Sequence, residues 1–222
     1  MEKLLLCFLL SIGLFSASEA DLNGQAFVFL RQSAVSFVSL TAQLKKPLRA
    51  FTVCLYAYSD LTRAYSLFSY ATRTVDNEIH LYKEETGEYS HTVGGAGVNF
   101  RPPVRSPAPL HFCMTWESAS GITELWVDGK PMARKSLKKG YSLGTDASII
   151  LGQEQDSYGG NFDEEQSFVG DIGDVNMWDF VLSPDEINIV YAGGTFSPNV
   201  LDWQTLKYEV FGEVFIKPKL WP

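Results

Sequence analysis

The stretch Leu110-His111-Phe112-Cys113-Met114-Thr115-Trp116 decides the fold class of this chain. Large apolar residues fall at every second position from Phe112 to Trp116, so an extended backbone places them on one face. Alternation of this kind is typical of a strand with one face on a hydrophobic core. The next apolar run, residues 123–127, ends at Asp128-Gly129, a dipeptide that favours a tight hairpin turn. Together the two runs predict a pair of strands.

Similar runs continue outward in both directions along the chain. They are rich in Val, Ile, Phe, Tyr and Thr and are separated by Gly, Pro, Asp and Asn, which is the pattern of many short strands. We expect further strands at Ala26–Leu30, Phe51–Tyr58, Tyr65–Ala71, Glu78–Tyr82, Tyr89–Val93, Ser148–Leu151, Val169–Trp178 and Val210–Ile216. The sequence therefore predicts an all-β fold, a two-sheet antiparallel jelly-roll sandwich.

One short helix is expected on a face of this sandwich. Ser183 suits the N-cap, Pro184 the first helical position, and Glu186 completes a capping box. We expect the helix to run to about Ala192, because Gly193-Gly194 would end it. Its packing face is expected to hold Ile187, Val190 and Tyr191.

The first twenty residues predict a secretory signal peptide. Lys3 precedes an apolar run at residues 4–10, and small residues follow. Cleavage after Ser18 and cleavage after Ala20 both satisfy the small-residue rule, so both stay open. No later run reaches the roughly 18 apolar residues of a membrane span. We therefore expect a secreted, extracellular protein with a single domain over residues 21–222.

Charge and cysteine content narrow the function classes. The formal net charge of −8 argues against a general nucleic-acid binder, because neutralising phosphates requires a basic face. Cys7 would leave with the signal peptide, so two of the three cysteines remain. In an oxidising compartment they are expected to form a Cys54–Cys113 disulfide, the alternative being two buried free thiols.

Residues 154–166, Glu-Gln-Asp-Ser-Tyr-Gly-Gly-Asn-Phe-Asp-Glu-Glu-Gln, form a segment rich in side-chain oxygen directly after an apolar run. Calcium prefers carboxylate, amide and carbonyl oxygens, whereas zinc and copper favour the His and Cys that this segment lacks. The spacing is not that of an EF-hand. On composition alone, a cation site and a solvated acidic loop both stay open.

An enzyme is the competing function class. Glu154 and Asp156 would lie on one face of an extended segment, as in jelly-roll glycosidases with a Glu-x-Asp-x-x-Glu motif. Gly159 stands at the last position of that motif, so the general acid is missing and we expect no enzymatic activity. The three histidines show neither metal spacing nor a nucleophile partner. The basic run Arg134–Lys139 has two possible interpretations, a polyanion-binding patch and an ordinary solvated surface.

The opening stretch also carries a family signature. Residues 111–118, His-Phe-Cys-Met-Thr-Trp-Glu-Ser, match the pentraxin pattern His-x-Cys-x-Ser/Thr-Trp-x-Ser/Thr at every specified position. The resemblance to short pentraxins covers essentially the whole chain after the signal peptide, including residues 68–70, 126–131, 149–156 and 177–179.

Short pentraxins fall into two types, here called the first and the second, and parts of this sequence resemble each of them. Residues 174–188 and the ending 219–222 favour the first type, whereas residues 57–61 and 66–70 lean toward the second. The sequence contains no Asn-x-Ser/Thr glycosylation site, which agrees better with the first type.

The resemblance implies two calcium ions on one face of each subunit. The family's ligand positions fall on Asp76, Asn77, Glu154, the backbone carbonyl of Gln155, Asp156, Asp163 and Gln166. Asp163 stands where the first type usually has Glu, so a shorter acid would have to reach the ion. The implied function is calcium-dependent recognition of phosphocholine and other phosphate-bearing ligands on microbial or damaged-cell surfaces, in acute-phase innate immunity.

The implied phosphocholine pocket falls on Tyr82, Thr92 and Gly97. Tyr82 keeps an aromatic face that attracts a quaternary ammonium. Gly97 stands where the family pocket has a Glu facing that cation, so we expect weaker discrimination for choline. The alternative is a calcium-dependent lectin like the second type, which binds phosphoethanolamine, acidic sugars or amyloid.

The resemblance further implies a homopentamer with its calcium faces on one side and its helices on the other. Asp128 and Tyr191 match positions implicated in recruiting the first complement component, and Fc receptors are further implied partners. Both residues also have plain structural interpretations, Asp128 as a turn residue and Tyr191 as part of the helix packing face.

Overall fold

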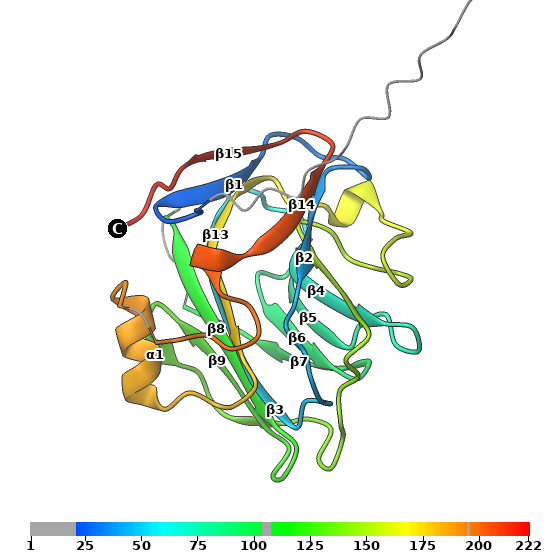
Figure 1. Ribbon diagram of the computed structural model, residues 1–222, viewed down its shortest axis with the longest axis vertical. Coiled ribbons are helices and arrows are strands. Elements are labelled where there is room, and N and C mark those ends of the chain that lie inside the picture. Colours follow the sequence, from blue (N-terminus) through cyan, green and yellow to red (C-terminus); the bar gives the residue numbers. More distant parts are fainter. Residues whose placement is uncertain (1–20, 104–107, 195) are drawn as a thin grey trace, which may run out of the picture.

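The computed structural model describes residues 21–103, 108–194 and 196–222, so the expected signal peptide at 1–20 lies outside the described residues. The described chain forms two antiparallel sheets packed face to face (Figure 1). In spatial order, the first sheet contains β10 (Lys130–Pro131), β9 (Ile122–Val127), β8 (Leu110–Glu117), β3 (Ala50–Tyr58), β13 (Gly170–Trp178), β1 (Gln25–Phe29) and β15 (Val214–Pro218), and β11 (Lys135–Ser136) also pairs with β9.

In spatial order, the second sheet contains β14 (Lys207–Phe211), β2 (Phe37–Thr41), β12 (Ala147–Leu151), β4 (Tyr65–Thr72), β5 (Ile79–Lys83), β6 (Tyr89–Val93) and β7 (Ala96–Phe100). The connections include one α-helix, α1 (Pro184–Tyr191), and two 3₁₀ turns, η1 (Glu164–Gln166) and η2 (Trp203–Thr205). The predicted all-β jelly-roll sandwich with one short helix is confirmed.

Strand β8 lies inside the first sheet between β3 and β9, as its alternating sequence predicts. Phe112, Met114 and Trp116 are buried in the main core. The opposite face of β8 is buried as well, because α1 and the segment before it pack against Cys113 (Figure 1). Each large apolar side chain buried here contributes roughly 1.5–3 kcal/mol, which explains why this stretch fixes the architecture.

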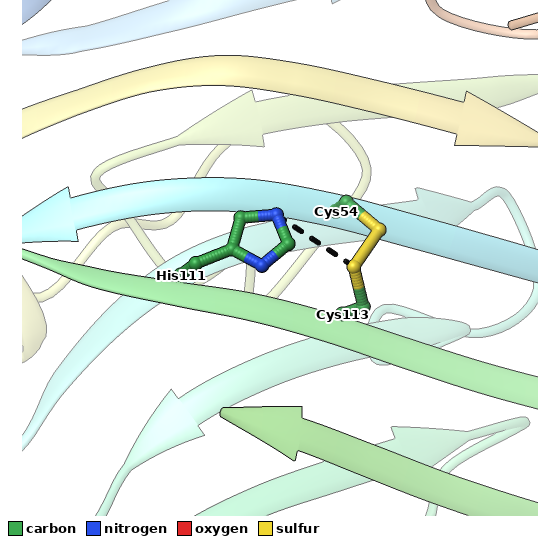
Figure 2. Close-up of side chains that lie close together, drawn as sticks. All are labelled: Cys54, His111 and Cys113. Atoms are coloured by element: carbon green, nitrogen blue, oxygen red, sulfur yellow. Dashed lines mark hydrogen bonds between the residues drawn. A yellow bond between two sulfur atoms is a disulfide. The ribbon is translucent and has the colours of Figure 1, made fainter. Parts of the chain in front are cut away.

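A disulfide joins Cys54 of β3 to Cys113 of β8 and confirms the expected pairing (Figure 2). The two residues are directly opposite in the strand register, with their Cα atoms 4.1 Å apart. Closing a loop of this length stabilises the fold by roughly 4 kcal/mol in the chain-entropy view. His111 Nε2 lies 3.8 Å from Cys113 Sγ, but the sulfurs are bonded to each other and offer no thiolate to a metal.

Helix α1 begins at the predicted capping box. Ser183 Oγ accepts a hydrogen bond from the Glu186 backbone N–H at 3.3 Å, and Glu186 Oε2 accepts from the Ser183 backbone N–H at 2.6 Å. The helix ends at Tyr191. Ile187 is fully buried in a cluster with the disulfide.

Tyr191 was expected to be buried on the packing face of α1, and that burial is wrong, because 38% of its surface is exposed. Tyr191 belongs to the last turn of the helix, beside the turn at Asp128-Gly129, and its ring centroid is 5.5 Å from that of His111 in β8. A Cβ on Gly129 would lie 2.8 Å from Tyr191 Cδ1. The helix therefore packs mainly through Ile187 and, in part, Val190.

The C-terminal segment also differs from prediction. The sequence predicts one strand at Val210–Ile216, but β14 and β15 are separate strands in different sheets. The chain turns at Gly212, whose φ of +65° is in the left-handed region, and a Cβ there would lie 2.7 Å from the Val35 carbonyl oxygen. A single glycine within an apolar run thus ends one strand. The prediction also omitted β2, β7 and the two-residue strands β10 and β11.

Candidate metal and ligand site

Two connections beside the second sheet bring expected metal ligands together. Asp76-Asn77 lies between β4 and β5, and Glu154 follows β12, which pairs with β4. Asn77 Nδ2 donates a hydrogen bond to Glu154 Oε1 at 3.2 Å. Because β4 pairs with both β5 and β12, two distant parts of the chain meet at this point.

Gln155 anchors the oxygen-rich loop to the sheet. Its buried Nε2 donates to the carbonyl oxygens of Ser69 and Ser148, both at 3.1 Å. Its Oε1 accepts from the Gly159 backbone N–H at 2.9 Å, and Gly159 has a φ of +76°. From the sequence, only the backbone carbonyl of Gln155 is expected at the site. The side chain has the separate role of folding the loop back after the exposed Asp156.

Glu154 has an electrostatic environment that suits a cation. Burial raises the pKa of its carboxyl to about 7. The hydrogen bond from Asn77 opposes this rise, and the charges of Asp156 and Asp76 add to it. Without a cation, an ionised Glu154 therefore lies partly desolvated among like charges.

Two amide oxygens at the expected ligand positions fit a hard cation. Asn77 Oδ1 and Gln166 Oε1 are buried, and within the described part of the chain neither has a hydrogen-bond partner. Buried polar atoms are rarely left unpaired, so such atoms call for a partner. Oxygens from amides and carboxylates are the ligands that calcium prefers.

The acidic residues do not form a tight cluster. Asp163 Oδ1 caps η1 by accepting from the Glu165 backbone N–H at 3.0 Å, so it has a structural role of its own. Within the ranges that the structure describes, Cys54, His111 and Cys113 are the only group of three or more His, Cys, Asp or Glu ligand atoms within 4.8 Å of one another. The candidate site thus combines dispersed carboxylates with amide oxygens.

The expected ligand residues lie on three adjacent strands next to these loops. Thr92 of β6 pairs with His80 of β5 on one side and with Gly97 of β7 on the other. Tyr82 is two residues beyond His80, and the Gln166 side chain lies near its hydroxyl, where it opposes the rise in the Tyr82 pKa that burial causes. Tyr82 therefore links the ligand residues to an expected metal ligand.

Gly97 leaves this part of the surface open. A Cβ at this position would lie 3.1 Å from Thr92 Oγ1 and 3.3 Å from Ser90 Oγ. Two hydroxyl groups therefore border the space where a side chain at position 97 would stand.

Asp128 and Tyr191 lie together on the first sheet's side of the molecule. With Tyr56 and Trp221 they line one cleft. Asp128 Oδ1 accepts from the His111 backbone N–H at 3.0 Å, and its φ of +50° places it in the turn between β9 and β10. The structural role expected for Asp128 is confirmed.

His80, for which the sequence predicts no role in the site, lies beside Glu154. His80 Nδ1 is 3.8 Å from Glu154 Oε1, and Nε2 is 3.0 Å from Ser66 Oγ. A single histidine within β5, Ile-His-Leu-Tyr-Lys, gives no metal-ligand spacing signal. The one sequence signal for a role in the site was that His80 lies two residues from Tyr82, on the same face of the strand.

Comparison with known proteins settles the family. A profile of the Pentaxin family matches residues 25–218. The chain is a pentraxin. Calcium binding is a general property of this family, whose members are non-enzymatic pattern-recognition proteins, and this pentraxin has no enzymatic activity. The glycosidase alternative is thereby excluded.

The pentraxin is 66% identical to the C-reactive protein of Sus scrofa and 63% identical to that of Homo sapiens, over the full length of each pair of chains. It is 52% identical to the serum amyloid P-component of Bos taurus, over 92% of both chains. These two proteins are the first and second short types considered above. The preference for the first is confirmed, and the chain is an acute-phase pattern-recognition protein of innate immunity.

The fold has a solved counterpart of low sequence identity. The heptameric SAP-like pentraxin of Limulus polyphemus has a TM-score of 0.80 to this chain at 20% identity, covering 90% of this chain and 98% of that one. This likeness concerns the fold alone. Among the described residues, no helix has the length and apolar character needed to cross a membrane.

Proposed function

We propose that this pentraxin uses calcium to bind phosphocholine and related phosphate-bearing groups on microbial or damaged-cell surfaces. The observation that carries the proposal is the pair of buried amide oxygens of Asn77 and Gln166, which have no hydrogen-bond partner among the described residues. Asn77 also contacts the desolvated Glu154. A hard cation satisfies both needs at once. Two ions per subunit would be held by Asp76, Asn77, Glu154, Gln155, Asp156, Asp163 and Gln166.

Bound calcium supplies positive charge and an open coordination position for a phosphate oxygen. The chain's own side chains orient the rest of the ligand. Tyr82 offers its ring face to a cationic group, and the nearby Gln166 side chain places the ring beside an expected metal ligand. Thr92 borders the ligand from the neighbouring strand.

Gly97 favours a second candidate ligand. With no carboxylate at this position, a quaternary ammonium loses its charge partner. The hydroxyls of Ser90 and Thr92 stay available for hydrogen bonds. Phosphoethanolamine or acidic sugars, and by extension amyloid, could therefore compete with phosphocholine.

Assembly and location complete the proposal. A signal peptide at residues 1–20 and the Cys54–Cys113 disulfide support secretion into an oxidising compartment. A homopentamer would present several weak sites to one surface and bind it by avidity. Asp128 and Tyr191 line a cleft on the first sheet's side of the molecule, so the first complement component or Fc receptors would bind there without blocking the ligand residues on the second sheet.

A phosphocholine affinity column tests the ligand. In millimolar calcium the wild-type protein should be retained and should elute with chelator. Elution by free phosphoethanolamine at the same concentration as by phosphocholine would favour the second candidate. Flow-through in millimolar calcium would contradict the proposed ligands.

A further inference from the structure

His80 is a buried polar residue beside the candidate metal site to which the proposed function gives no role. It lies on β5 with only 4% of its surface exposed, and its ring centroid is 5.3 Å from that of Tyr82. One ring nitrogen faces Glu154 and the other faces Ser66. A buried imidazole with both nitrogens directed at polar groups is held in one orientation, which a residue that only fills space does not require.

The Ser66 hydroxyl decides which nitrogen of His80 carries the proton. Ser66 Oγ is 2.9 Å from the Gln153 carbonyl oxygen and 3.0 Å from His80 Nε2, and its single hydrogen serves one of them. When Ser66 donates to Nε2, the proton of the neutral ring is on Nδ1 and faces Glu154. When Ser66 donates to Gln153, Nε2–H donates to Ser66 and Nδ1 turns a lone pair toward the carboxylate. The first arrangement leaves the Ser66 and Gln153 oxygens facing each other 2.9 Å apart, whereas the second turns the Nδ1 lone pair toward a full negative charge on Glu154. The full charge outweighs the contact between two neutral oxygens, so an ionised Glu154 selects the first arrangement.

Both protein donors approach the same oxygen of Glu154. Asn77 Nδ2 is 3.2 Å and His80 Nδ1 is 3.8 Å from Oε1. The other carboxylate oxygen, Oε2, is left available to a cation. Asn77 likewise uses one side-chain atom for a protein contact and leaves the other available to a cation. Its Nδ2 contacts Glu154, and its Oδ1 has no hydrogen-bond partner among the described residues.

We infer that His80 is a positioning residue for calcium: its Nδ1–H, oriented by Ser66, holds Glu154 so that one carboxylate oxygen is free for the ion. The inference rests on the proposed calcium site. In the loaded protein the 3.8 Å separation between His80 Nδ1 and Glu154 Oε1 shortens toward a hydrogen bond of about 3 Å. Groups that orient metal ligands in this way set the metal affinity.

Calcium affinity of full-chain variants, measured by isothermal titration, tests this role. Melting temperature in chelator reports folding separately. His80→Leu removes both ring nitrogens and should weaken calcium binding by about 10-fold or more. His80→Asn keeps an N–H close to the position of Nδ1, so its calcium affinity should stay within about threefold of wild type. This loss is smaller than the one expected for His80→Leu.

Two further variants separate positioning from packing. His91→Leu is the matched control, because His91 is fully buried on the neighbouring strand and bonds Thr123 Oγ1 at 2.8 Å. It should lower the melting temperature in chelator and leave calcium affinity unchanged. Ser66→Ala removes the group that orients the imidazole and should weaken binding by about 10-fold even if His80→Leu fails to fold.

Wild-type calcium affinity in folded His80→Leu or Ser66→Ala would overturn the role of His80. If Asp156→Ala still abolished phosphocholine binding in that case, the proposed function would stand. Equal losses in His80→Leu, His80→Asn and His91→Leu would also overturn the inference, because affinity would then follow the stability of the sheet. A wild-type protein that takes up no calcium would overturn both.

Discussion

Asn77 and Glu154 share a hydrogen bond of 3.2 Å across 77 residues of sequence. The bond uses the amide nitrogen of Asn77 and one carboxylate oxygen of Glu154, so the amide oxygen is left without a partner among the described residues. This contact joins the connection between β4 and β5 to the loop after β12. The candidate calcium site depends on it.

Asp156→Ala should abolish calcium-dependent binding to phosphocholine-coated surfaces and leave the assembly intact, because Asp156 is exposed on the loop. Surface binding and the native mass of the assembly measure the two effects. Asp185→Ala is the control, since Asp185 is equally acidic and exposed but lies on α1. Collapse of the assembly in Asp156→Ala would refute this separation.

Glu154→Gln should stabilise the calcium-free protein at high pH. Burial raises the pKa of Glu154 from 4.5 to about 7, so its stabilising contribution is present below pH 4.5 and is lost as pH rises through 7. We expect the free energy of unfolding in chelator to increase by about 1–2 kcal/mol at pH 8, after allowing for solvent screening, and to change little at pH 4. Urea unfolding measures both. An equal effect at the two pH values would contradict the assignment.

His91→Phe should make the protein more resistant to acid. Burial lowers the pKa of His91 from 6.5 to about 3, so its contribution is present above pH 6.5 and is lost as pH falls below it. The variant should recover about 1.4 kcal/mol of unfolding free energy per pH unit between pH 6 and pH 4. Urea unfolding over this range tests the slope. Parallel curves for wild type and variant would mean that His91 does not titrate on unfolding.

Gly97→Glu should increase the preference for phosphocholine over phosphoethanolamine by about 10-fold, since a charge contact with a quaternary ammonium is worth about 1–2 kcal/mol in a partly desolvated site. The φ of Gly97 is outside the left-handed region, so a side chain is tolerated after a small shift of Thr92 and Ser90. Competition for a phosphocholine column measures the preference. Gly97→Ala supplies the matched control without charge, and an equal effect of both variants would assign the change to shape.

Local patterns in the sequence predicted most of the fold. Alternation in residues 110–116 gave β8, the capping box at Ser183 gave α1, and the count of cysteines gave the Cys54–Cys113 disulfide. These succeed because period, capping and pairing are set by neighbouring residues or by residue type. The division of residues 210–216 at Gly212 was not predictable, because it depends on the approach of Val35 from β2's side of the fold.

By itself, the sequence determined which groups this pentraxin can offer: an oxygen-rich loop, an aromatic residue at Tyr82 and no carboxylate at Gly97. Only the tertiary structure decided how they act. Strand pairing across β12, β4 and β5 buries Glu154, raises its pKa and places His80 and Asn77 on the same carboxylate oxygen. The burial of Glu154 and the position of the proton on His80 depend on several strands at once. No single stretch of sequence therefore predicts them.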